Sequence, residues 1–249
     1  MSTPPVLAMR GLRAGYGTQL VLHGIDLDLA RGEWLGLLGP NGSGKSSLIH
    51  CLTGQLAPRA GRIRLAGFDV TDQPLAARAR LGYAVPPETL PAALTGWQCL
   101  QVYAAAKRLP AIDADVVAFA QTLRMRDRLD DMVGTYSFGT RQKLCVLLAL
   151  LGEPALIVLD EAFNGLDPAS ALCLKRHLRE RVDAGASVLL ATHALDVIEH
   201  QADRAVLLYE GRIAGRWDRA SLQALRARAN GEGLEAAMAD AIERAATGA

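Results

Sequence analysis

A short glycine-rich segment near the amino end has the residues and spacing of a phosphate-binding loop. Residues 39–46 read GPNGSGKS, which fits the pattern G-x-x-x-x-G-K-[ST] after an apolar strand and before a helical pattern. The glycines let backbone N–H groups approach a phosphate, and the helix that begins there adds its positive end. We expect Lys45 to bridge the β- and γ-phosphates of a nucleotide and Ser46 to ligate Mg²⁺. The alternative is a plain glycine-rich turn.

Two carboxylates that follow an apolar run complement this loop. Residues 156–161 read LIVLDE, so that Asp160 and Glu161 stand at the end of a predicted buried strand. Ligands of open α/β sheets bind at the carboxyl ends of strands. We expect Asp160 to hold Mg²⁺ through water, and Glu161 to orient and partly deprotonate an attacking water molecule. The alternative is a strand followed by an acidic helix cap.

The order of the predicted strands and helices indicates an α/β fold. Its sheet would take strands from both ends of the chain, with a helical insertion between them. Strands and helices alternate after residue 152, which is typical of a parallel sheet covered by helices, whereas residues 86–152 are predicted to be helical. The predicted strands cover residues 6–13, 19–29, 33–38, 61–66, 80–84, 155–159, 187–191 and 204–209. The predicted helices cover residues 46–56, 97–109, 113–125, 137–151, 168–183 and 194–200. Two short helices are expected in the tail, around residues 231–233.

The composition excludes several classes of protein. The chain has 249 residues, half of them apolar, which is enough for a full hydrophobic core and argues against disorder. Its 27 basic residues face 26 acidic ones, so no nucleic acid partner is expected. The longest apolar stretch, residues 144–159, is interrupted by Gly-Glu-Pro, and we expect no membrane span. Four scattered cysteines predict core thiols in a reducing compartment, which favours a cytoplasmic protein.

Taken in order, these motifs resemble the ATP-binding subunit of an ABC (ATP-binding cassette) transporter over about residues 6–216. Tyr16 matches the aromatic residue that stacks on adenine in that family. Residues 164–167, NGLD, resemble the segment called the D-loop, and His193 corresponds to the switch histidine that contacts the γ-phosphate. The Asn-Lys-x-Asp string of common guanine-binding proteins is absent from the sequence. Other histidines, His50 among them, match nothing in the family pattern.

The resemblance implies a P-loop NTPase fold of the cassette type, with a mixed parallel core sheet, an antiparallel β subdomain and a helical subdomain. It implies a single ATPase domain, in which residues 1–85 and 153–216 form the nucleotide-binding core, residues 86–152 the helical subdomain and residues 217–249 a C-terminal helical extension. The residues expected to bind ATP are Tyr16, Asn41, Gly42, Ser43, Gly44, Lys45, Ser46, Ser47, Ser137, Gly139 and Asp167. The residues expected to act in catalysis are Lys45, Glu161 and His193, and the expected Mg²⁺ ligands are Ser46 and Asp160.

Two segments depart from the family pattern. The family signature Leu-Ser-Gly-Gly-Gln corresponds to residues 136–140, YSFGT, in which Ser137 and Gly139 are kept and Phe138 replaces the first glycine. The glutamine that touches Mg²⁺ and the attacking water in the family falls on Pro86, which has neither a donor nor a carboxamide. We assign no substitute for it, and slow hydrolysis is one expected outcome.

The resemblance also implies partners. Two cassettes would face each other head-to-tail, as a homodimer or a mixed pair, and each would complete the ATP site of the other with Ser137 and Gly139. A separate membrane-spanning subunit would dock around residues 86–108 and place the chain at the inner face of the membrane. The sequence around residues 163–168 and the altered signature look more like exporter subunits than importers.

Two alternatives stay open at this point. The first is an ATP-regulated cassette with little or no turnover, which Pro86 and Phe138 favour and Glu161 and His193 oppose. The second is a cassette ATPase that serves DNA repair or ribosomes. The sequence has neither the long coiled-coil insertion nor the paired cassettes of those proteins. The basic run at residues 175–181 is interspersed with acidic residues and is interpreted as a solvated helix face.

Overall fold

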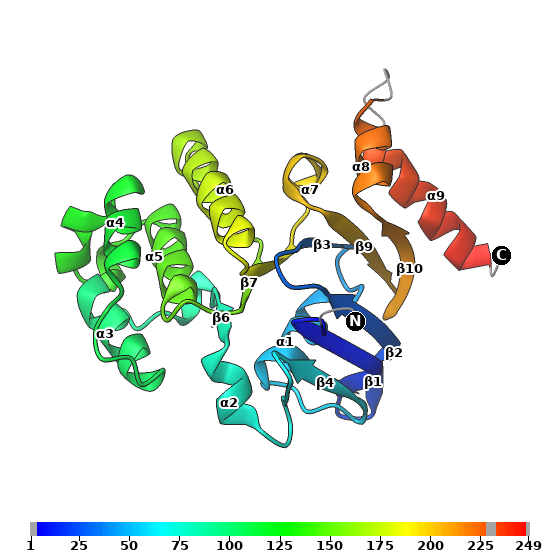
Figure 1. Cartoon of the computed structure of the whole chain (residues 1–249), viewed down its shortest axis with the longest axis horizontal. Coiled ribbons are helices and arrows are strands. Elements are labelled where there is room, and N and C mark those ends of the chain that lie inside the picture. Colours follow the sequence, from blue (N-terminus) through cyan, green and yellow to red (C-terminus); the bar gives the residue numbers. More distant parts are fainter. Residues whose placement is uncertain (1–3, 228–232, 248–249) are drawn as a thin grey trace.

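Two β-sheets form the frame of the protein, and helices surround them (Figure 1). The computed structural model describes residues 4–227 and 233–247. A four-stranded antiparallel sheet has the order β2-β1-β4-β5, and a six-stranded sheet has the order β10-β9-β3-β8-β7-β6. The strands are β1 (Leu7–Tyr16), β2 (Gln19–Leu29), β3 (Trp34–Leu38), β4 (Ala60–Leu65), β5 (Phe68–Asp69), β6 (Leu81–Tyr83), β7 (Leu156–Asp160), β8 (Ser187–Ala191), β9 (Arg204–Tyr209) and β10 (Arg212–Trp217).

Helices lie around the two sheets, and those between residues 96 and 150 stand together on one side of the molecule (Figure 1). The α-helices are α1 (Lys45–Thr53), α2 (Pro74–Ala79), α3 (Gly96–Ala106), α4 (Ala114–Thr122), α5 (Phe138–Leu150), α6 (Pro168–Asp183), α7 (Leu195–Gln201), α8 (Arg219–Arg226) and α9 (Gly233–Thr247). Three short 3₁₀ helices are η1 (Pro87–Thr89), η2 (Arg126–Asp130) and η3 (Val133–Thr135). None of the helices in the described ranges has the length and apolar character that crossing a bilayer requires.

The order of the strands in the six-stranded sheet decides which chain segments meet at its carboxyl edge. Strand β8 pairs in parallel with β3 on one side and with β7 on the other. Strand β6 pairs in parallel with β7, and β10 closes the far edge antiparallel to β9. All residues of β3 and β8 are buried, as expected for strands covered on both faces. The loops that follow β3, β8 and β7 therefore emerge side by side.

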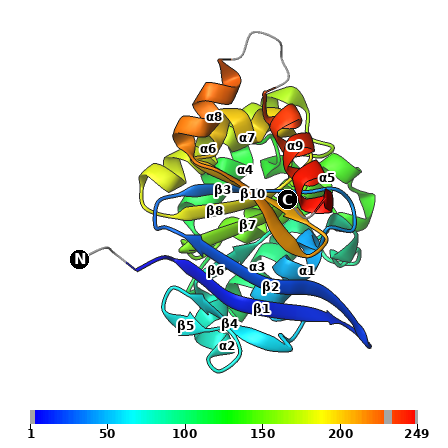
Figure 2. The same cartoon turned by 90° about the vertical axis from the view of Figure 1, so that its right-hand side faces the viewer.

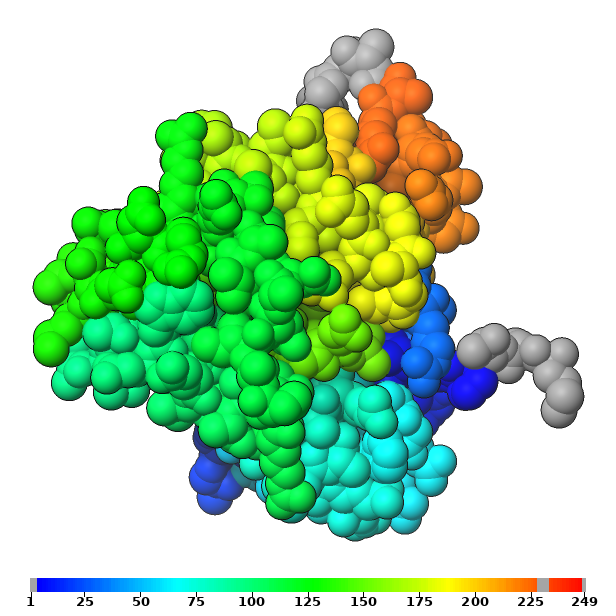
Figure 3. Space-filling model, turned by 60° about the vertical axis from the view of Figure 1, so that its left-hand side comes forward, coloured from blue at the N-terminus to red at the C-terminus, as the bar shows by residue number. Residues whose placement is uncertain are grey.

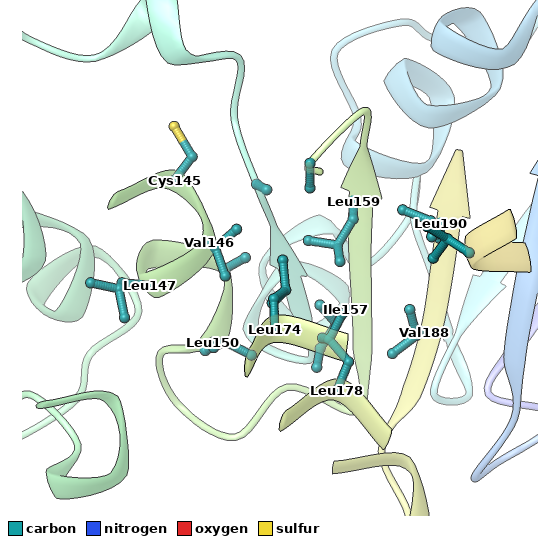
Figure 4. Close-up of a cluster of buried hydrophobic side chains, with 14 of the residues drawn as sticks. Cys145, Val146, Leu147, Leu150, Ile157, Leu159, Leu174, Leu178, Val188 and Leu190 are labelled. Atoms are coloured by element: carbon teal, nitrogen blue, oxygen red, sulfur yellow. The ribbon is translucent and has the colours of Figure 1, made fainter. Parts of the chain in front are cut away.

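Two hydrophobic cores lie on the two faces of this sheet. One joins the sheet to the antiparallel sheet and α1 through residues such as Leu27, Leu37 and Leu48. The other joins it to α5, α6, the C-terminal helices and the rest of the helical region. Figure 4 shows part of the second core, where Leu174 and Leu178 of α6 point toward β7 and β8. In Figure 2 the antiparallel strands lie on one side of the six-stranded sheet, and α8 and α9 lie on the other.

The region between residues 86 and 152 stands beside the sheets and is helical, as the sequence predicts. In the space-filling view it forms the green lobe, which rests against α6 and the cyan segment around α2 (Figure 3). Two of its predicted helices end early, at Ala106 and Thr122. Arg108 and Arg124 follow those ends with φ values of +59° and +55°, which no α-helix can continue. The predicted helix over residues 46–56 ends at Thr53 for the related reason that Gly54 adopts φ +74°.

The α/β class and most elements match the sequence prediction, but β5, α2 and β10 were missed. Strand β10 is partly exposed throughout and contains Gly215, so that it lacks the buried pattern on which the other strands were recognised. The predicted tail helices are α8 and α9, and residues 231 and 232 between them lie outside the described residues. The proposed boundaries at residues 85, 152 and 216 stay a prediction, and β10 runs across the last of them.

Candidate nucleotide site

An open cleft of about 680 Å³ lies where the loops after β3, β8 and β7 emerge. It brings together residues that are more than 100 positions apart in the sequence. From the phosphate-binding loop it takes Asn41, Gly42, Ser43, Gly44, Lys45, Ser46 and Ser47, and from the other two strand ends it takes Asp160, Glu161 and His193. The structure thus gathers every predicted catalytic and metal-binding residue at one place.

The phosphate-binding loop has the backbone that its glycines permit. Gly42 and Gly44 have φ values of +79° and +107°, a region that side chains disfavour. Gly44 also stands at the cap position of α1 and offers no side-chain partner to the first N–H groups of that helix. Ser43 Oγ is buried without a hydrogen-bond partner in the described part of the chain. Free donors at a helix N-terminus are the chemistry that holds a phosphate.

Lys45 is buried and folds back onto this loop. Its Nζ donates to the carbonyl oxygens of Gly39, at 2.5 Å, and Pro40, at 3.1 Å. Burial lowers the pKa of Lys45, while the nearby carboxylates of Glu161 and Asp160 oppose that shift. An anion in the cleft would offer this ammonium group a better partner than two neutral carbonyls do.

Ser46 and Asp160 form the part of the cleft that could hold a divalent cation. The Ser46 hydroxyl donates to Asp160 Oδ2 at 3.4 Å. Burial raises the pKa of Asp160, and the charge of Glu161 raises it further. Two oxygen ligands suit Mg²⁺, which keeps several water and phosphate oxygens in its shell. Within the described ranges, no group of three or more acidic, histidine or cysteine side chains has an arrangement that could hold a metal ion by itself.

Glu161 follows β7 directly and is anchored to the end of β8. Its backbone has φ +49°, and its N–H donates to the Ala191 carbonyl at 2.8 Å. Its Oε2 accepts hydrogen bonds from Thr192 Oγ1 at 3.2 Å and from the His193 N–H at 3.4 Å. Its Oε1 lies 3.5 Å from His193 Nε2, and that ring nitrogen lies 3.1 Å from Asn41 Oδ1. Glu161, His193 and the phosphate-binding loop are therefore linked through one set of contacts.

The segment at residues 136–140 packs against residues 164–167 of the same chain. Ser137 caps α5, and its Oγ accepts from the Thr140 N–H at 3.3 Å. A Cβ atom at Gly139 would lie 2.3 Å from the Gly165 carbonyl oxygen, and one at Gly165 would lie 2.5 Å from the Phe138 ring. Phe138 lines the cleft, whereas Ser137 and Gly139 are absent from its lining.

Asp167 caps a helix and lies outside the cleft lining. Its carboxylate accepts from the Ser170 N–H at 2.9 Å and from the Ser170 hydroxyl at 2.6 Å, and it pairs with Lys143 at 3.0 Å. These hydrogen bonds and the lysine hold the pKa of Asp167 well below its usual range. Within one chain Asp167 is thus a structural residue, and its role toward a nucleotide stays a prediction.

Comparison with known proteins decides the family. The model of the ABC transporter family matches residues 22–164 of this chain. The chain belongs to the ABC transporter family. An uncharacterized ABC transporter ATP-binding protein of Bacillus subtilis, YdbJ, is 36% identical over 84% of this chain and 68% of its own length. The Nod factor export ATP-binding protein I of Ralstonia nicotianae is 32% identical over 85% and 67%, respectively.

A solved structure supports the same assignment. An ATP-binding subunit of an ABC transporter superposes with a TM-score of 0.85 at 30% identity, covering 95% of this chain and 99% of that one. The cassette fold predicted from the ordered motifs is therefore confirmed. The chain is an ABC transporter ATP-binding subunit, in a family of ATPases.

The predicted contribution of Tyr16 to this ABC site is not seen at the cleft. Tyr16 is half exposed and absent from the lining, and its hydroxyl contacts His50 Nδ1 at 3.0 Å. His50 itself lines the cleft, although the sequence analysis gave it no role. Its position on α1, four residues after Ser46, could have revealed it, because residues four apart share a helix face.

Pro86, the residue that the sequence aligns with the family glutamine, lies in the cleft wall. Its carbonyl accepts from the Thr89 N–H at 2.9 Å, and its ring has nothing to donate. Glu88 also lines the cleft. Gln98 does not, since its Oε1 accepts from the Thr95 N–H in a capping box at the start of α3. Burial raises the pKa of the neighbouring Tyr83 to about 12, so that this phenol stays uncharged at neutral pH.

Proposed function

We propose that this ABC subunit binds and hydrolyses ATP and thereby powers the export of a substrate through a separate membrane subunit. One observation carries the proposal: a single cleft holds the phosphate-binding loop, the Ser46–Asp160 pair and the Glu161–His193 pair. A cleft that only bound a nucleotide would need the phosphate-binding loop but would not need the Glu161–His193 pair.

The residues of the cleft divide the chemistry between them. Lys45 and the loop N–H groups would neutralise the β- and γ-phosphates, while Ser46 and Asp160 would hold Mg²⁺. That ion would draw charge off the phosphates when bound. Glu161 Oε1, buried and without a hydrogen-bond partner among the described residues, is the atom that would accept a proton from water. His193 would hold the γ-phosphate in line with that water.

The proposed pairing of two cassettes follows from what the cleft lacks. It is open on one side, and Ser137 and Gly139, which the family pattern directs at ATP, do not line it. In a head-to-tail pair, these residues of the partner would close the site, and hydrolysis would remove the charge that bridges the two chains. We propose that residues 86–108 contact the membrane subunit, and that the chain works at the inner face of the membrane.

The proposal of export rests on the relatives rather than on the cleft. The name of the Ralstonia nicotianae protein states that it serves the export of Nod factor. The signature segment of this chain, with Phe138 in place of glycine, departs from the common pattern in a way we associate with exporter subunits. The transported substrate would be bound by the membrane subunit and is not encoded in this cleft.

Replacement of Glu161 by glutamine tests the proposed reaction. Glu161→Gln keeps the shape of the side chain but removes the proton acceptor, so we expect phosphate release to fall by about 10²-fold or more. ATP should then remain bound and hold two chains together, which size-exclusion chromatography would show as a dimer. Glu180→Gln, on the exposed face of α6, is the matched control. A Glu161→Gln protein that hydrolyses ATP at the parent rate would refute the assignment of the base.

A cassette that binds ATP but hydrolyses it slowly, acting as a switch, is the second candidate. The observation that favours it is Pro86, which removes the carboxamide expected beside the metal and the attacking water. Phosphate release by the parent protein separates the two. Tight ATP binding without measurable phosphate would favour the switch.

A further inference from the structure

Thr192 contacts the proposed base but lies outside the cleft lining. It follows β8, is 1% exposed and has no family motif attached to it in the sequence. Its hydroxyl is therefore shielded from bulk water, and its hydrogen bonds must be found within the protein. The geometry points to Thr192 as a positioning residue for Glu161, a role that rests on the proposed hydrolytic function.

The direction of the hydrogen bonds at Thr192 is fixed by its two neighbours. The N–H of Ala194 donates to Thr192 Oγ1 at 3.0 Å, which occupies a lone pair of the hydroxyl. The hydroxyl proton then points to the other polar neighbour, Glu161 Oε2, at 3.2 Å. An ionised carboxylate can only accept, so Thr192 must donate to Glu161.

This hydrogen bond assigns different tasks to the two oxygens of Glu161. Oε2 also faces the His193 N–H and Asn164 Nδ2, both at 3.4 Å, and the bond from Thr192 is the shortest of the three. Oε1 is left buried and without a hydrogen bond among the described residues. Because Oε2 is held, the carboxylate cannot rotate freely, and Oε1 keeps its place 3.5 Å from Nε2 of His193, a residue of the cleft lining.

The side-chain contact adds to a main-chain contact from the same strand end. The Glu161 N–H donates to the carbonyl of Ala191, which immediately precedes Thr192. Glu161 adopts φ +49°, an uncommon value for a residue with a side chain, and therefore needs such support. The end of β8 thus holds both the backbone and the carboxylate of the base. A displacement of about 1 Å at a reacting group can cost a large factor in rate.

The test compares two substitutions that separate the hydroxyl from the methyl group. Thr192→Val keeps the shape and removes the donor, whereas Thr192→Ser keeps the donor and removes the methyl group. We expect Thr192→Val to lower kcat about tenfold, while KM and the ATP dissociation constant measured by calorimetry stay within about twofold. Thr192→Ser should restore kcat to within about threefold of the parent. In a crystal structure of nucleotide-free Thr192→Val, the Glu161 carboxylate should leave its place.

Several outcomes would overturn the inference. A Thr192→Val protein with the kcat of the parent would overturn it. Equal losses of kcat in Thr192→Val and Thr192→Ser would also overturn it, because they would indicate a packing role for Thr192. Should the valine variant fail to fold, Thr192→Ala removes the hydroxyl without placing a methyl group against Glu161, and the same expectations apply. A parent rate in Glu161→Gln would overturn the proposed function and this inference together. If Glu161→Gln hydrolyses ATP slowly while Thr192→Val hydrolyses it at the parent rate, this inference alone would be overturned.

Discussion

The two walls of the cleft are built in different ways. On the sheet wall, Ser46 contacts Asp160, Glu161 contacts Thr192, and His193 contacts Asn41, so that each contact joins segments far apart in the sequence. On the helical wall, Pro86 and Phe138 bring rings without donors to the cleft. Ser137 on that side is occupied by the cap of its own helix.

This difference between the two walls separates the contacts that one chain makes by itself from the contacts for which a partner chain is proposed. The groups of the sheet wall sit at the ends of the buried strands β3 and β8 and of β7, elements of regular structure that position side chains precisely, and they belong to the motifs predicted from the sequence. On the helical wall, the sequence predicts departures from the family pattern at Pro86 and Phe138, which are expected to face the metal and a second cassette. We therefore expect ATP binding and the chemical step to depend on the sheet wall, and the residues of the helical wall to modulate the rate of turnover.

Loss of Lys45 would break the sheet wall and has the largest expected effect. Lys45→Ala should weaken ATP binding by at least about 100-fold, because the phosphates lose a buried ammonium group. Calorimetry with Mg²⁺ and ATP measures this directly. Lys175→Ala, which removes an ion pair with Asp196 on the helix surface, is the matched control and should bind ATP as the parent does. Equal binding by Lys45→Ala would contradict the assignment of the phosphate site.

Restoring the missing glutamine would sharpen the comparison at the helical wall. Pro86 has φ −58° and ψ 134°, which glutamine adopts without strain, so Pro86→Gln should fold normally. We expect it to raise kcat about tenfold by adding a carboxamide beside the metal and the attacking water. The phosphate release assay measures it, with Pro91→Gln on the exposed segment before α3 as the control. An unchanged kcat would show that Pro86 does not limit turnover.

The smallest expected effect is a change in unfolding free energy on altering the contact between Phe138 and Gly165. It tests whether Phe138 packs against residue 165 of the same chain. Gly165 has φ +75°, and a Cβ atom there would overlap the Phe138 ring. Gly165→Ala should therefore cost about 2 kcal/mol of unfolding free energy, of which about half comes from the backbone and the rest from the ring. In a Phe138→Ala background the cost should fall to about 1 kcal/mol. Urea unfolding of the four proteins measures this coupling, and equal costs in both backgrounds would show that the ring lies elsewhere.

Much of the fold could be predicted from the sequence, because its buried strands and helices have clear periodicity. Helix α6 and strands β8 and β9 begin and end where the pattern predicts. Strand β10 could not be predicted, since its partly exposed residues resemble a loop. The helix ends at Ala106 and Thr122 depend on single residues with positive φ, Arg108 and Arg124, which no pattern of apolar residues announces.

The candidate site was predictable to the extent that its residues stand next to one another in the chain. The phosphate-binding loop and the Asp160–Glu161 pair are local signals, and both lie at the cleft. Thr192 and His50 carry no such signal, because a threonine after a strand or a histidine in a helix is ordinary. Only their contacts with Glu161 and with the cleft single them out.

The sequence alone determined the phosphate-binding loop, the acidic strand end and the alternation that requires a parallel sheet, since each depends on neighbouring residues and on the period of the backbone. The tertiary structure decided that β8 lies between β3 and β7. Strand order is set by the packing of the whole sheet and leaves no trace in local spacing. That order places Thr192 and His193 between the loop and the carboxylates, and it turns separate motifs into one site.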